Sequence, residues 1–314
     1  MFEKYWQSKL TVVIPAYNED QGITPTLISL KKSLPDVKII VVDDASTDNT
    51  AAVALKVDSV RVIKHDYNYG YGGALKTGMI YSDTEFVAWF DADGEHRIED
   101  LVSMVDIIHE KQCIAVIGQR TTGSTTRIRA VGKFIIRMLA RSLDVRAGND
   151  LNCGLRVYKR EVICRYLSVL PDGFSASLTS LMIMLEQGYP TEFHPVKAAV
   201  RIGQSKVRLM DGFSTMALVL RIIMLFAPLR IFFRAGFMLI AFSFLYSMIF
   251  AYVVGTGIPV AGALGILSGG LLLVVGLIAD QISQLRLLQL SANNTLPYRS
   301  IKSDNIMDLQ RAKK

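Results

Sequence analysis

Two apolar stretches near the C-terminal end restrict most strongly what this chain can fold into. Residues 231–254 and 258–279 are each apolar for more than 20 residues, if Arg234 is counted as an anchor at the membrane surface. About 20 apolar residues suffice for a helix to cross a bilayer. We therefore expect two transmembrane helices, joined by a tight turn at Gly255-Thr256-Gly257. Two buried helices of a soluble protein are the alternative, which the lack of a polar face on either stretch disfavours.

Basic residues flank this apolar pair on both sides. Arg221, Arg230 and Arg234 come at its start, and Arg286, Arg299 and Lys302 come after it. Because Lys and Arg are enriched in cytoplasmic loops, we expect both flanks and the N-terminal domain in the cytoplasm. Residues 209–230 mix arginines with apolar residues, which predicts a helix in the membrane interface. The tail, residues 281–314, is polar and basic, and we expect a short interfacial helix and then a mobile end.

The composition agrees with a membrane-bound protein of a reducing compartment. The chain has 314 residues, and its mean hydropathy of +0.32 is high because apolar residues are concentrated after residue 213. Its net charge of +7 comes mainly from residues 120–146 and 197–234, which suit phosphates or anionic lipids; nucleic acid is disfavoured because no binding motif for it is present. The three cysteines show no metal-ligand spacing and predict no disulfide. Residues 1–10 lack the apolar core of a cleaved signal peptide.

The first 208 residues alternate short apolar, β-branched runs with segments of helical pattern. Expected strands cover residues 10–15, 37–42, 60–64, 86–90, 114–118 and 155–158, and expected helices cover 24–34, a stretch ending near 57, 70–82, 98–111, 131–143 and 175–187. This alternation predicts an α/β fold with a mostly parallel sheet and helices on both faces. Ligands of such sheets bind beyond the carboxyl ends of the strands. Six polar side chains directly follow expected strands: Tyr17, Glu19, Asp43, Asp44, Asp91 and Asp93.

An acidic cluster follows the apolar run Phe86–Phe90. Asp91, Asp93 and Glu95 occupy alternate positions, and alternate side chains of an extended backbone share a face. Carboxylates arranged in this way suit a hard divalent cation such as Mg²⁺ or Mn²⁺, which fills its shell with water and phosphate oxygens. The pattern therefore predicts a site for a metal and a diphosphate. A solvated acidic turn after a strand is the alternative.

Three further segments carry polar or glycine-rich motifs. Tyr69 to Ala74 contains three glycines between a strand and a helix, but the spacing is not the dinucleotide-binding fingerprint, and a tight turn able to approach a phosphate explains it. Asp150 opens a turn before a short strand and is expected to be a backbone cap. Residues 201–208 hold three cations, a glycine and a hydroxyl, a set that can bind a phosphate through charge-assisted hydrogen bonds.

Together these motifs resemble glycosyltransferase family 2, and within it the polyprenyl-phosphate glycosyltransferases such as dolichyl-phosphate mannose synthase and its bacterial undecaprenyl-phosphate relatives. The resemblance covers nearly all of residues 10–290. It rests on the apolar pair and on five motifs in this order: Pro15-Ala16-Tyr17-Asn18-Glu19, Val42-Asp43-Asp44-Ala45-Ser46, Asp91-Ala92-Asp93-Gly94-Glu95-His96, Asp150-Leu151-Asn152-Cys153-Gly154-Leu155-Arg156, and the loop 201–206. Many relatives carry Gln where this chain has Glu95.

The resemblance implies an A-type nucleotide-sugar glycosyltransferase fold, Rossmann-like, over residues 1–208, followed by the interfacial region 209–230, two transmembrane helices in 231–280 and the cytoplasmic tail 281–314. It implies a nucleotide-sugar site formed by Pro15, Ala16, Tyr17, Glu19, Asp43, Asp44, Asp91, Ala92 and Asp93. The metal, Mg²⁺ or Mn²⁺, would be held by Asp91, Asp93 and Glu95. The acceptor phosphate would lie against Arg120, Arg129, Arg201, Ser205 and Lys206. Catalysis would depend on Asp91, Asp93, Asp150, Arg120 and Arg201.

The implied reaction transfers a sugar, with inversion, from a UDP- or GDP-linked donor to a polyprenyl phosphate in the bilayer. A strong general base is not required for it, because a phosphate monoester is mostly dianionic at neutral pH. Asp150 is then an orienting residue. A processive polysaccharide synthase and an inactive, membrane-tethered nucleotide-sugar-binding protein are the alternatives. Assembly into a homo-oligomer through the membrane helices is also expected from the resemblance.

Overall fold

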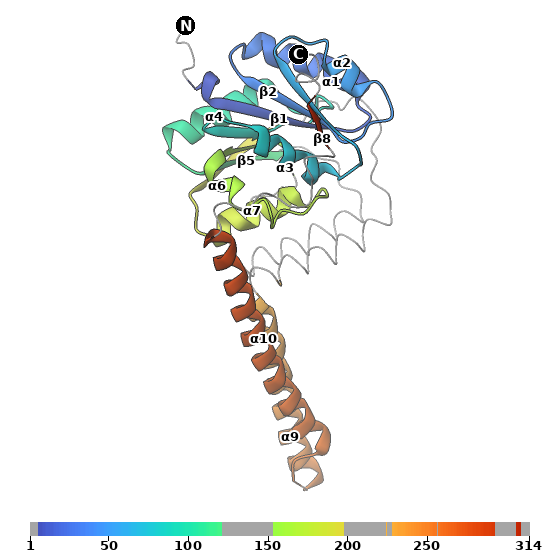
Figure 1. Cartoon of the computed structure of the whole chain (residues 1–314). Coiled ribbons are helices and arrows are strands. Elements are labelled where there is room, and N and C mark those ends of the chain that lie inside the picture. The colour runs from blue at the N-terminus through green and yellow to red at the C-terminus, as the bar shows by residue number, and fades with distance from the viewer. Residues whose placement is uncertain are drawn as a thin grey trace. The chain divides into compact units, whose positions relative to one another are not determined.

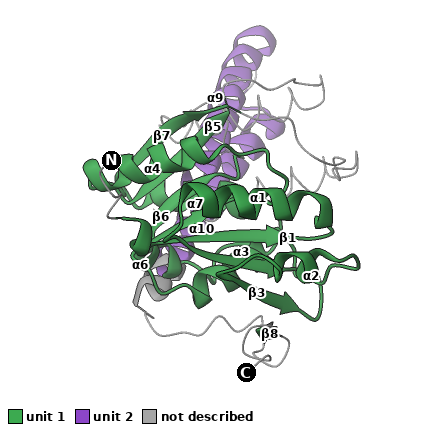
Figure 2. Cartoon of the chain, turned by 90° about the horizontal axis from the view of Figure 1, so that it is seen from above, with its two compact units in different colours: residues 1–127, 147–208, 293–314 green, residues 128–146, 209–292 purple. Residues whose placement is uncertain are grey.

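The structure is a computed structural model, and it describes residues 6–120, 153–197, 224, 228–255, 257–292 and 306–308. The chain divides into two compact units (Figure 2). Unit 1 comprises residues 1–127, 147–208 and 293–314, and unit 2 comprises residues 128–146 and 209–292.

Unit 1 is built on one eight-stranded sheet with the order β7-β5-β6-β4-β1-β2-β3-β8. Four strands lie parallel in its centre: β1 (Leu10–Ala16), β2 (Lys38–Asp43), β3 (Val60–His65) and β4 (Phe86–Trp89). The outer part contains β5 (Ala115–Arg120), β6 (Arg156–Lys159) and β7 (Thr191–Val196). β5 and β7 are parallel, and β6 is antiparallel to both of its neighbours, β4 and β5. The mostly parallel sheet predicted from the sequence is confirmed.

Helices cover both faces of this sheet (Figure 1). One face carries α1 (Asp20–Ser33), α2 (Thr50–Ala54) and α4 (Ile98–Glu110), and the other carries α3 (Tyr71–Tyr81), α6 (Arg160–Cys164) and α7 (Ala176–Glu186). The period of two along β1 separates the two layers: Val12 and Ile14 belong to the larger core under α1 and α4, whereas Val13 packs against Gly78 of α3. Both faces of the strands are therefore buried, as their continuous apolar sequences require.

Several boundaries differ from those predicted. α1 begins at Asp20 and not near Thr24, so Pro25 lies inside the helix and not in its first turn. Because proline has no backbone N–H, the helix lacks one main-chain hydrogen bond at this position. α2 ends at Ala54, three residues before the predicted end near 57. The sequence did not predict α6, β7 or β8.

The tail of the chain supplies the last strand of the sheet. β8 (Ile306–Asp308) pairs antiparallel with the end of β3, with Ile306 opposite His65 and Asp308 opposite Ile63. The Asp308 carboxylate binds the guanidinium of Arg61, with Oδ2 at 2.7 Å from Nη2 and 3.1 Å from Nε. The expectation of a mobile end is wrong for these three residues, because the open edge of β3 offers unpaired backbone groups to a strand.

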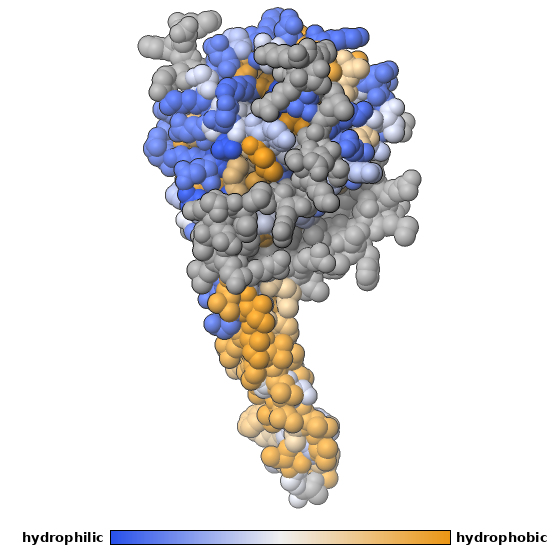
Figure 3. Space-filling view, viewed as in Figure 1, coloured by the Kyte–Doolittle hydropathy of each residue, from blue (hydrophilic) through white to orange (hydrophobic). Residues whose placement is uncertain are grey.

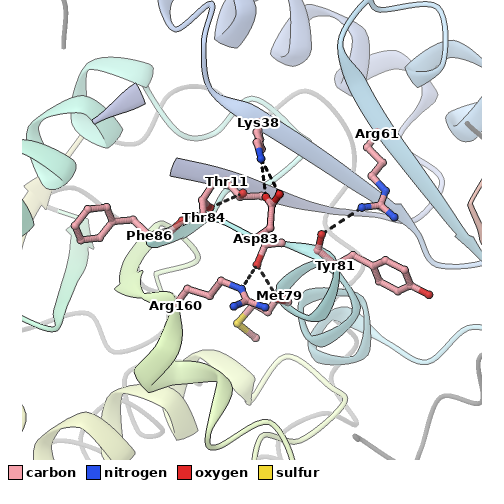
Figure 4. Close-up of polar contacts among 10 residues, drawn as sticks. Thr11, Lys38, Arg61, Met79, Tyr81, Asp83, Thr84, Phe86 and Arg160 are labelled. Carbon is pink, nitrogen blue, oxygen red and sulfur yellow. Dashed lines mark hydrogen bonds and ion pairs between the residues drawn. The ribbon is translucent and has the colours of Figure 1, made fainter. Parts of the chain in front are cut away.

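Polar contacts join the amino ends of the strands, at the edge opposite the acidic side chains (Figure 4). The hydroxyl of Thr11, in β1, lies 2.6 Å from that of Thr84. Since Thr84 donates its own proton to the Phe86 carbonyl at 2.9 Å, the Thr11 hydroxyl is the donor to Thr84. Lys38, at the start of β2, binds both carboxylate oxygens of Asp83 at 2.8 Å. These contacts fix where β4 begins beside β1, and hence where its acidic end emerges.

Unit 2 contains two long helices, α9 (Pro228–Val254) and α10 (Val260–Ala292). Ile231–Val254 and Val260–Leu285 are long and apolar enough to cross a membrane, and apolar side chains cover the face of this hairpin seen in Figure 3. The two predicted spans are thus both helices. The short interfacial helix expected after residue 281 is the continuation of α10. Met224 and the first residues of α9 are the described part of the predicted interfacial region, 209–230.

The two helices of the hairpin meet through small residues. A Cβ added to Gly269 would lie 2.8 Å from the Gly236 carbonyl oxygen and 2.5 Å from the Ile240 side chain. A Cβ on Gly265 would meet the hydroxyl of Ser243, which is itself buried. Small residues at such positions allow two helices in a membrane to approach closely. Gly262, Gly265, Gly269 and Gly276, which the sequence shows only as part of an apolar run, therefore lie on the packing face of α10.

Candidate active site

The loops that follow β1 and β2 are tied together at the carboxyl edge of the sheet. The backbone N–H of Asn18 donates to the Ser46 hydroxyl at 3.0 Å, and the Asn18 side-chain oxygen accepts from the Thr47 N–H at 2.9 Å. The N–H of Glu19 donates to the hydroxyl of Thr50 at 2.9 Å. The loops after β1 and β2 therefore lie together at one edge of the sheet, although the residues in contact are 28 or more positions apart in the sequence. This agrees with the prediction for parallel strands.

Asp44 organises the next loop along this edge. Its carboxylate is 3 % exposed. The carboxylate accepts hydrogen bonds from the backbone N–H groups of Tyr69 and Gly70, at 2.8 and 2.7 Å, and lies 2.8 Å from Nδ1 of His65. Because an ionised carboxylate only accepts, His65 donates through Nδ1. Asp44 therefore has a clear structural role in holding residues 65–70, and its binding of a nucleobase stays a prediction.

Asp43 is fully buried beside it. Its Oδ1 accepts a hydrogen bond from the Ser46 N–H at 3.1 Å. Its Oδ2 has no hydrogen-bond partner among the residues that the structure describes, although the ammonium of Lys64 lies 4.0 Å away. A buried carboxylate oxygen without a hydrogen bond destabilises the protein unless a nearby cation offsets it. Lys64 is the described cation that lies beside this oxygen.

The acidic cluster does not have the extended geometry assumed from its alternate spacing. The chain turns at residues 92–94, where Gly94 has a φ of +72°. The Asp93 carboxylate accepts a hydrogen bond from the Glu95 N–H at 3.0 Å, and the Glu95 carboxylate binds Nη1 of Arg120 at 2.8 Å. Glu95 is therefore directed to an arginine and not to a shared face with Asp91. In the described part of the chain, no group of three or more His, Cys, Asp or Glu residues is arranged to hold a metal ion.

Both oxygens of Asp91 are oriented by neighbours. The Tyr71 hydroxyl donates to Oδ1 at 3.1 Å, and Nε2 of His96 lies 2.9 Å from Oδ2. Burial alone would raise the pKa of Asp91, but the hydrogen bond and charge of His96, the Tyr71 hydroxyl and the charge of Arg120 lower this pKa below its ordinary value. Asp91 is therefore ionised at neutral pH.

The pKa values of the two partners of Asp91 are shifted as well. Burial lowers the pKa of His96, but the hydrogen bond to Asp91 and the nearby acids outweigh it and raise this pKa. Burial and the charge of Asp91 raise the pKa of Tyr71 well above its ordinary value, so the phenol keeps its proton and remains a donor. Neither residue was given a role from the sequence. A histidine five positions after the first acid of the cluster was the signal available for His96.

The segment that leads into β6 packs closely against Asp91. A Cβ on Gly154 would lie 2.3 Å from Asp91 Oδ2, so only glycine fits there. Arg156 is fully buried; its Nε donates to the Cys153 carbonyl at 2.8 Å, and its Nη1 lies 3.2 Å from the Ser180 hydroxyl. The described half of the Asp150 to Arg156 motif therefore forms part of this site.

The glycine-rich segment has a role that the sequence did not predict. A Cβ on Gly72 would lie 2.1 Å from the Pro171 carbonyl oxygen, and one on Gly70 would lie 2.7 Å from that of Asp172. Gly70 also has a φ of +88°, in the region that favours glycine. These glycines are required because the backbone of residues 171–173 packs directly on them. The interpretation as a turn that approaches a phosphate has no support from this packing.

The structure brings all nine predicted nucleotide-sugar residues to one edge: Pro15, Ala16, Tyr17, Glu19, Asp43, Asp44, Asp91, Ala92 and Asp93. The loops after β1 and β4 also meet there, since a Cβ on Gly22 would lie 3.1 Å from the Ala92 carbonyl oxygen and 3.4 Å from the Asp93 Cα. Arg120, predicted on the acceptor side, contacts Glu95. Asp150, Arg129, Arg201, Ser205 and Lys206 lie outside the described residues, and their roles stay predictions.

Comparison with known proteins agrees with this geometry. Residues 11–164 match the family described as Glycosyl transferase family 2, and residues 227–285 match the GtrB C-terminal hairpin. By this match, residues 11–164 belong to glycosyltransferase family 2. The family predicted from the sequence motifs is thus confirmed. The first match covers Asp43, Asp44, Asp91 and Asp93, and the second covers α9 and most of α10.

Several members of the family are similar to this chain in sequence. A dolichyl-phosphate hexose transferase of Haloferax volcanii is 28% identical over 206 residues, 65% of this chain and 89% of its own length. A dolichyl-phosphate beta-glucosyltransferase of Dictyostelium discoideum is 28% identical over 51% of this chain and 57% of its own length. An undecaprenyl-phosphate 4-deoxy-4-formamido-L-arabinose transferase of Proteus mirabilis is 29% identical over 52% of each chain. The chain thus spans between about half and nine tenths of the length of these relatives.

Solved structures of other proteins share the fold. Glucosyl-3-phosphoglycerate synthase from Mycobacterium tuberculosis, in a complex with Mn²⁺ and UDP-glucose, matches with a TM-score of 0.56 and 18% identity, over 68% of this chain and 78% of that one. At this identity the likeness concerns the fold. It confirms the predicted A-type α/β architecture of the glycosyltransferase, here followed by two long apolar helices.

Proposed function

We propose that this glycosyltransferase transfers a sugar from a nucleoside diphosphate sugar to a polyprenyl phosphate. The observation that carries the proposal is the arrangement of Asp91 and Asp93 at the edge where the loops after β1 and β2 also end, in a chain that carries the family's C-terminal hairpin. The names of three relatives point to the same acceptor class, dolichyl or undecaprenyl phosphate. We infer that the donor is UDP- or GDP-linked.

The oxygen ligands available at this edge fit a divalent cation held by two carboxylates. Burial raises the pKa of Asp91, but His96, Tyr71 and Arg120 outweigh it and keep Asp91 ionised. The Asp93 carboxylate accepts a hydrogen bond from the Glu95 N–H, and the Cα of Asp93 lies near Gly22 at the same edge. Mg²⁺ and Mn²⁺ are commonly bound by one or two carboxylates together with water and substrate phosphate oxygens. Asp91 and Asp93 would hold the ion, and Glu95, bound to Arg120, would not. When bound, the ion supplies charge neutralisation for the leaving diphosphate.

The protein then needs to position two anionic substrates and to screen their charge. The acceptor phosphate has its second pKa at about 6, so it is already a nucleophile at neutral pH. It would attack the anomeric carbon as the bond to the diphosphate breaks, and the configuration inverts. Arg120 lies close enough to lower the pKa of Asp91, which makes it the described cation best placed to attract the incoming phosphate. Arg129, Arg201, Ser205 and Lys206 are proposed to complete that side.

The hairpin is proposed to hold the enzyme at the bilayer in which the acceptor is dissolved. Both of its helices are long and apolar enough to cross a membrane. The positive flanks of the pair favour a cytoplasmic position for the catalytic unit and for the tail. Nucleotide sugars would then reach the site from the cytoplasm, at the inner membrane of a bacterium. Oligomerisation through the hairpin is proposed from the resemblance alone.

The test is sugar transfer by the full-length protein in detergent or liposomes. UDP- and GDP-sugars are screened with undecaprenyl phosphate and Mn²⁺ or Mg²⁺, and release of the nucleoside diphosphate and formation of the lipid product are measured. Asp93→Asn, which keeps the shape of the side chain but removes its charge, should lower turnover by about 100-fold or more. Asp58→Asn, which makes the same change at an exposed aspartate just before β3, at the opposite edge of the sheet, is the matched control and should leave turnover per folded protein unchanged.

Two results would contradict the proposal. Turnover of Asp93→Asn close to that of the wild type would show that this carboxylate does not serve the reaction. Binding of nucleotide sugars by calorimetry without any lipid product, across the donor screen, would favour a binding protein over an enzyme.

A further inference from the structure

A short loop between α6 and α7 is held rigidly against the candidate active site. The Asp172 carbonyl accepts a hydrogen bond from the Gly73 N–H at 3.0 Å, and the Asp172 carboxylate binds the ammonium of Lys76 at 2.7 Å. Lys76 is 2 % exposed, so this ion pair is anchored inside the protein. At the other end of the loop, the Ala176 N–H donates to the Gly173 carbonyl at 3.1 Å. The loop therefore has a fixed position on the glycines of α3.

This loop presents a large aromatic ring to solvent. Phe174 is 77 % exposed, the most exposed large apolar side chain among the described residues of unit 1. Its ring stacks on that of Tyr71, with centroids 5.5 Å apart and planes inclined by 19°. One face of the ring is thus held by Tyr71, and the exposed remainder is available to a ligand.

A single residue, Tyr71, lies between the Phe174 ring and Asp91. Tyr71, on which Phe174 stacks, donates its hydroxyl to Asp91 at 3.1 Å. Under the proposed function, Asp91 holds the cation that binds the donor diphosphate. The group joined to the far side of that diphosphate is the sugar, whereas the nucleoside extends toward the loops after β1 and β2. The flat apolar surface of Phe174 is thus one side chain away from the residue that would bind the diphosphate to which the sugar is joined.

We propose that Phe174, supported by Tyr71, is a binding residue for the sugar ring of the donor. This inference rests on the proposed function and adds the residue that recognises the transferred group. One face of a pyranose carries mainly C–H groups, and an aromatic ring with its negative face exposed packs favourably against such groups. Aromatic side chains beside a few well-placed polar groups are the usual composition of small-molecule sites. The acceptor's isoprenoid chain is the competing occupant, and the test separates the two.

The test compares the binding of nucleotide with and without its sugar. Calorimetry on the full-length protein with Mn²⁺ uses four probes: UDP, UDP-glucose, GDP and GDP-mannose. With the base that the wild type binds, Phe174→Ala should bind the nucleoside diphosphate as tightly as the wild type and the nucleotide sugar about three- to tenfold more weakly. Phe174→Tyr, which keeps the ring, should restore sugar binding. Ile28→Ala, which truncates another exposed apolar residue of unit 1, is the control.

Steady-state kinetics distinguish the competing occupant. A sugar-binding role predicts a raised KM for the donor in Phe174→Ala and an unchanged KM for the polyprenyl phosphate. The inference is overturned if Phe174→Ala binds the nucleotide sugar like the wild type, if it loses the free nucleoside diphosphate equally, or if only the KM of the lipid rises. Absence of any nucleotide-sugar binding by the wild type would instead remove the proposed function on which the inference rests. Since Phe174 is exposed, thermal unfolding of the variant should match the wild type.

Discussion

At the scale of single residues, hydrogen bonds from neighbouring side chains fix the orientation of the Asp91 carboxylate. One oxygen accepts from the Tyr71 hydroxyl, and the other lies at 2.9 Å from Nε2 of His96. A carboxylate fixed in this way needs no rearrangement when it binds a cation, which is the effect that outer partners of metal ligands have in general. The Phe90 ring packs edge-on against the imidazole and holds it in place. We therefore treat His96 as a positioning residue.

The first prediction concerns His96. His96→Phe keeps an aromatic ring against Phe90 but removes the contact with Asp91. We expect transfer activity, or the affinity of the enzyme for Mn²⁺, to fall by about 10- to 100-fold. Initial rates measured over a series of Mn²⁺ concentrations check this, since a loss of orientation raises the concentration at which the metal half-saturates the enzyme. A lower plateau with the same half-saturation would assign His96 to the protein scaffold alone.

A second prediction concerns the pH dependence of stability through Lys76. Burial lowers the pKa of this lysine below its ordinary value of 10.5, against the opposing effect of Asp172. Between the lowered value and 10.5 the unfolded chain binds one more proton than the folded chain, so this group makes the free energy of unfolding rise with pH. Below the lowered value, the cost of burying the charge is fully present.

Lys76→Met removes that contribution while keeping an unbranched side chain. The difference in stability between the wild type and Lys76→Met should therefore shift in favour of the wild type as the pH rises from about 8 to about 10. Thermal unfolding at both pH values measures it, and the other titrating groups cancel in the comparison. A difference that stays constant, or that shifts in favour of Lys76→Met, would contradict the expected sign.

At the scale of secondary-structure elements, close approach decides where glycine is needed. In the hairpin, α9 and α10 touch at Gly236 and Gly269, where a Cβ on either residue would lie 2.8 Å from the backbone oxygen of the other. Without a hydrophobic effect between helices in lipid, contact at such small residues is what holds two membrane helices together. In unit 1 the same requirement explains Gly72 and Gly154, which meet a backbone loop and a carboxylate.

The third prediction tests the hairpin contact with two adjacent glycines. Gly269→Val inserts a branched side chain against the Gly236 carbonyl and the Ile240 side chain, and we expect it to cost about 1 to 3 kcal/mol. Gly270→Val makes the same chemical change where nothing lies within 4 Å. Thermal unfolding of the two purified variants in one detergent gives the comparison. Equal unfolding temperatures would show that α9 and α10 do not pack through Gly269.

At the scale of the whole molecule, the catalytic unit is made from segments on both sides of the hairpin. Residues 293–314 belong to unit 1, and β8 closes the edge of β3 within it. The Asp308 to Arg61 ion pair is partly buried, and the Arg61 guanidinium also lies over the Tyr81 ring at 4.9 Å. The catalytic unit therefore depends on a segment that follows both membrane helices in the sequence.

The fourth prediction follows from this arrangement. A chain that ends after Lys302 keeps the whole hairpin but loses β8, and we expect the catalytic unit to be less stable by about 1 to 2 kcal/mol. A chain that ends after Gln310 retains β8 and is the matched control. Thermal unfolding of both, compared with the full chain, measures the contribution of the strand. The prediction fails if the two shortened chains unfold at the same temperature.

Much of the fold was predictable because its signals are local. The β-branched runs at residues 10–15, 37–42 and 60–64 are strands within one residue of their observed ends. β8 was not predictable, since three residues in a polar tail become a strand only when the edge of β3 is beside them. The start of α1 was misplaced because the Thr-Pro pair resembles a helix start, whereas the Glu19 carbonyl already accepts the first helical hydrogen bonds.

The sequence by itself determined the α/β class, the apolar pair and the position of the acids after strands, because hydrophobic period and strand direction are properties of neighbouring residues. Only the tertiary structure decided which partner each acid meets: Glu95 pairs with Arg120, Asp91 with His96 and Tyr71, and Asp44 with residues 65–70. It also placed Phe174 beside Tyr71, although 103 positions separate them. Such contacts depend on the distance between side chains after folding, and that distance is set by how β-strands and loops far apart in the sequence pack together.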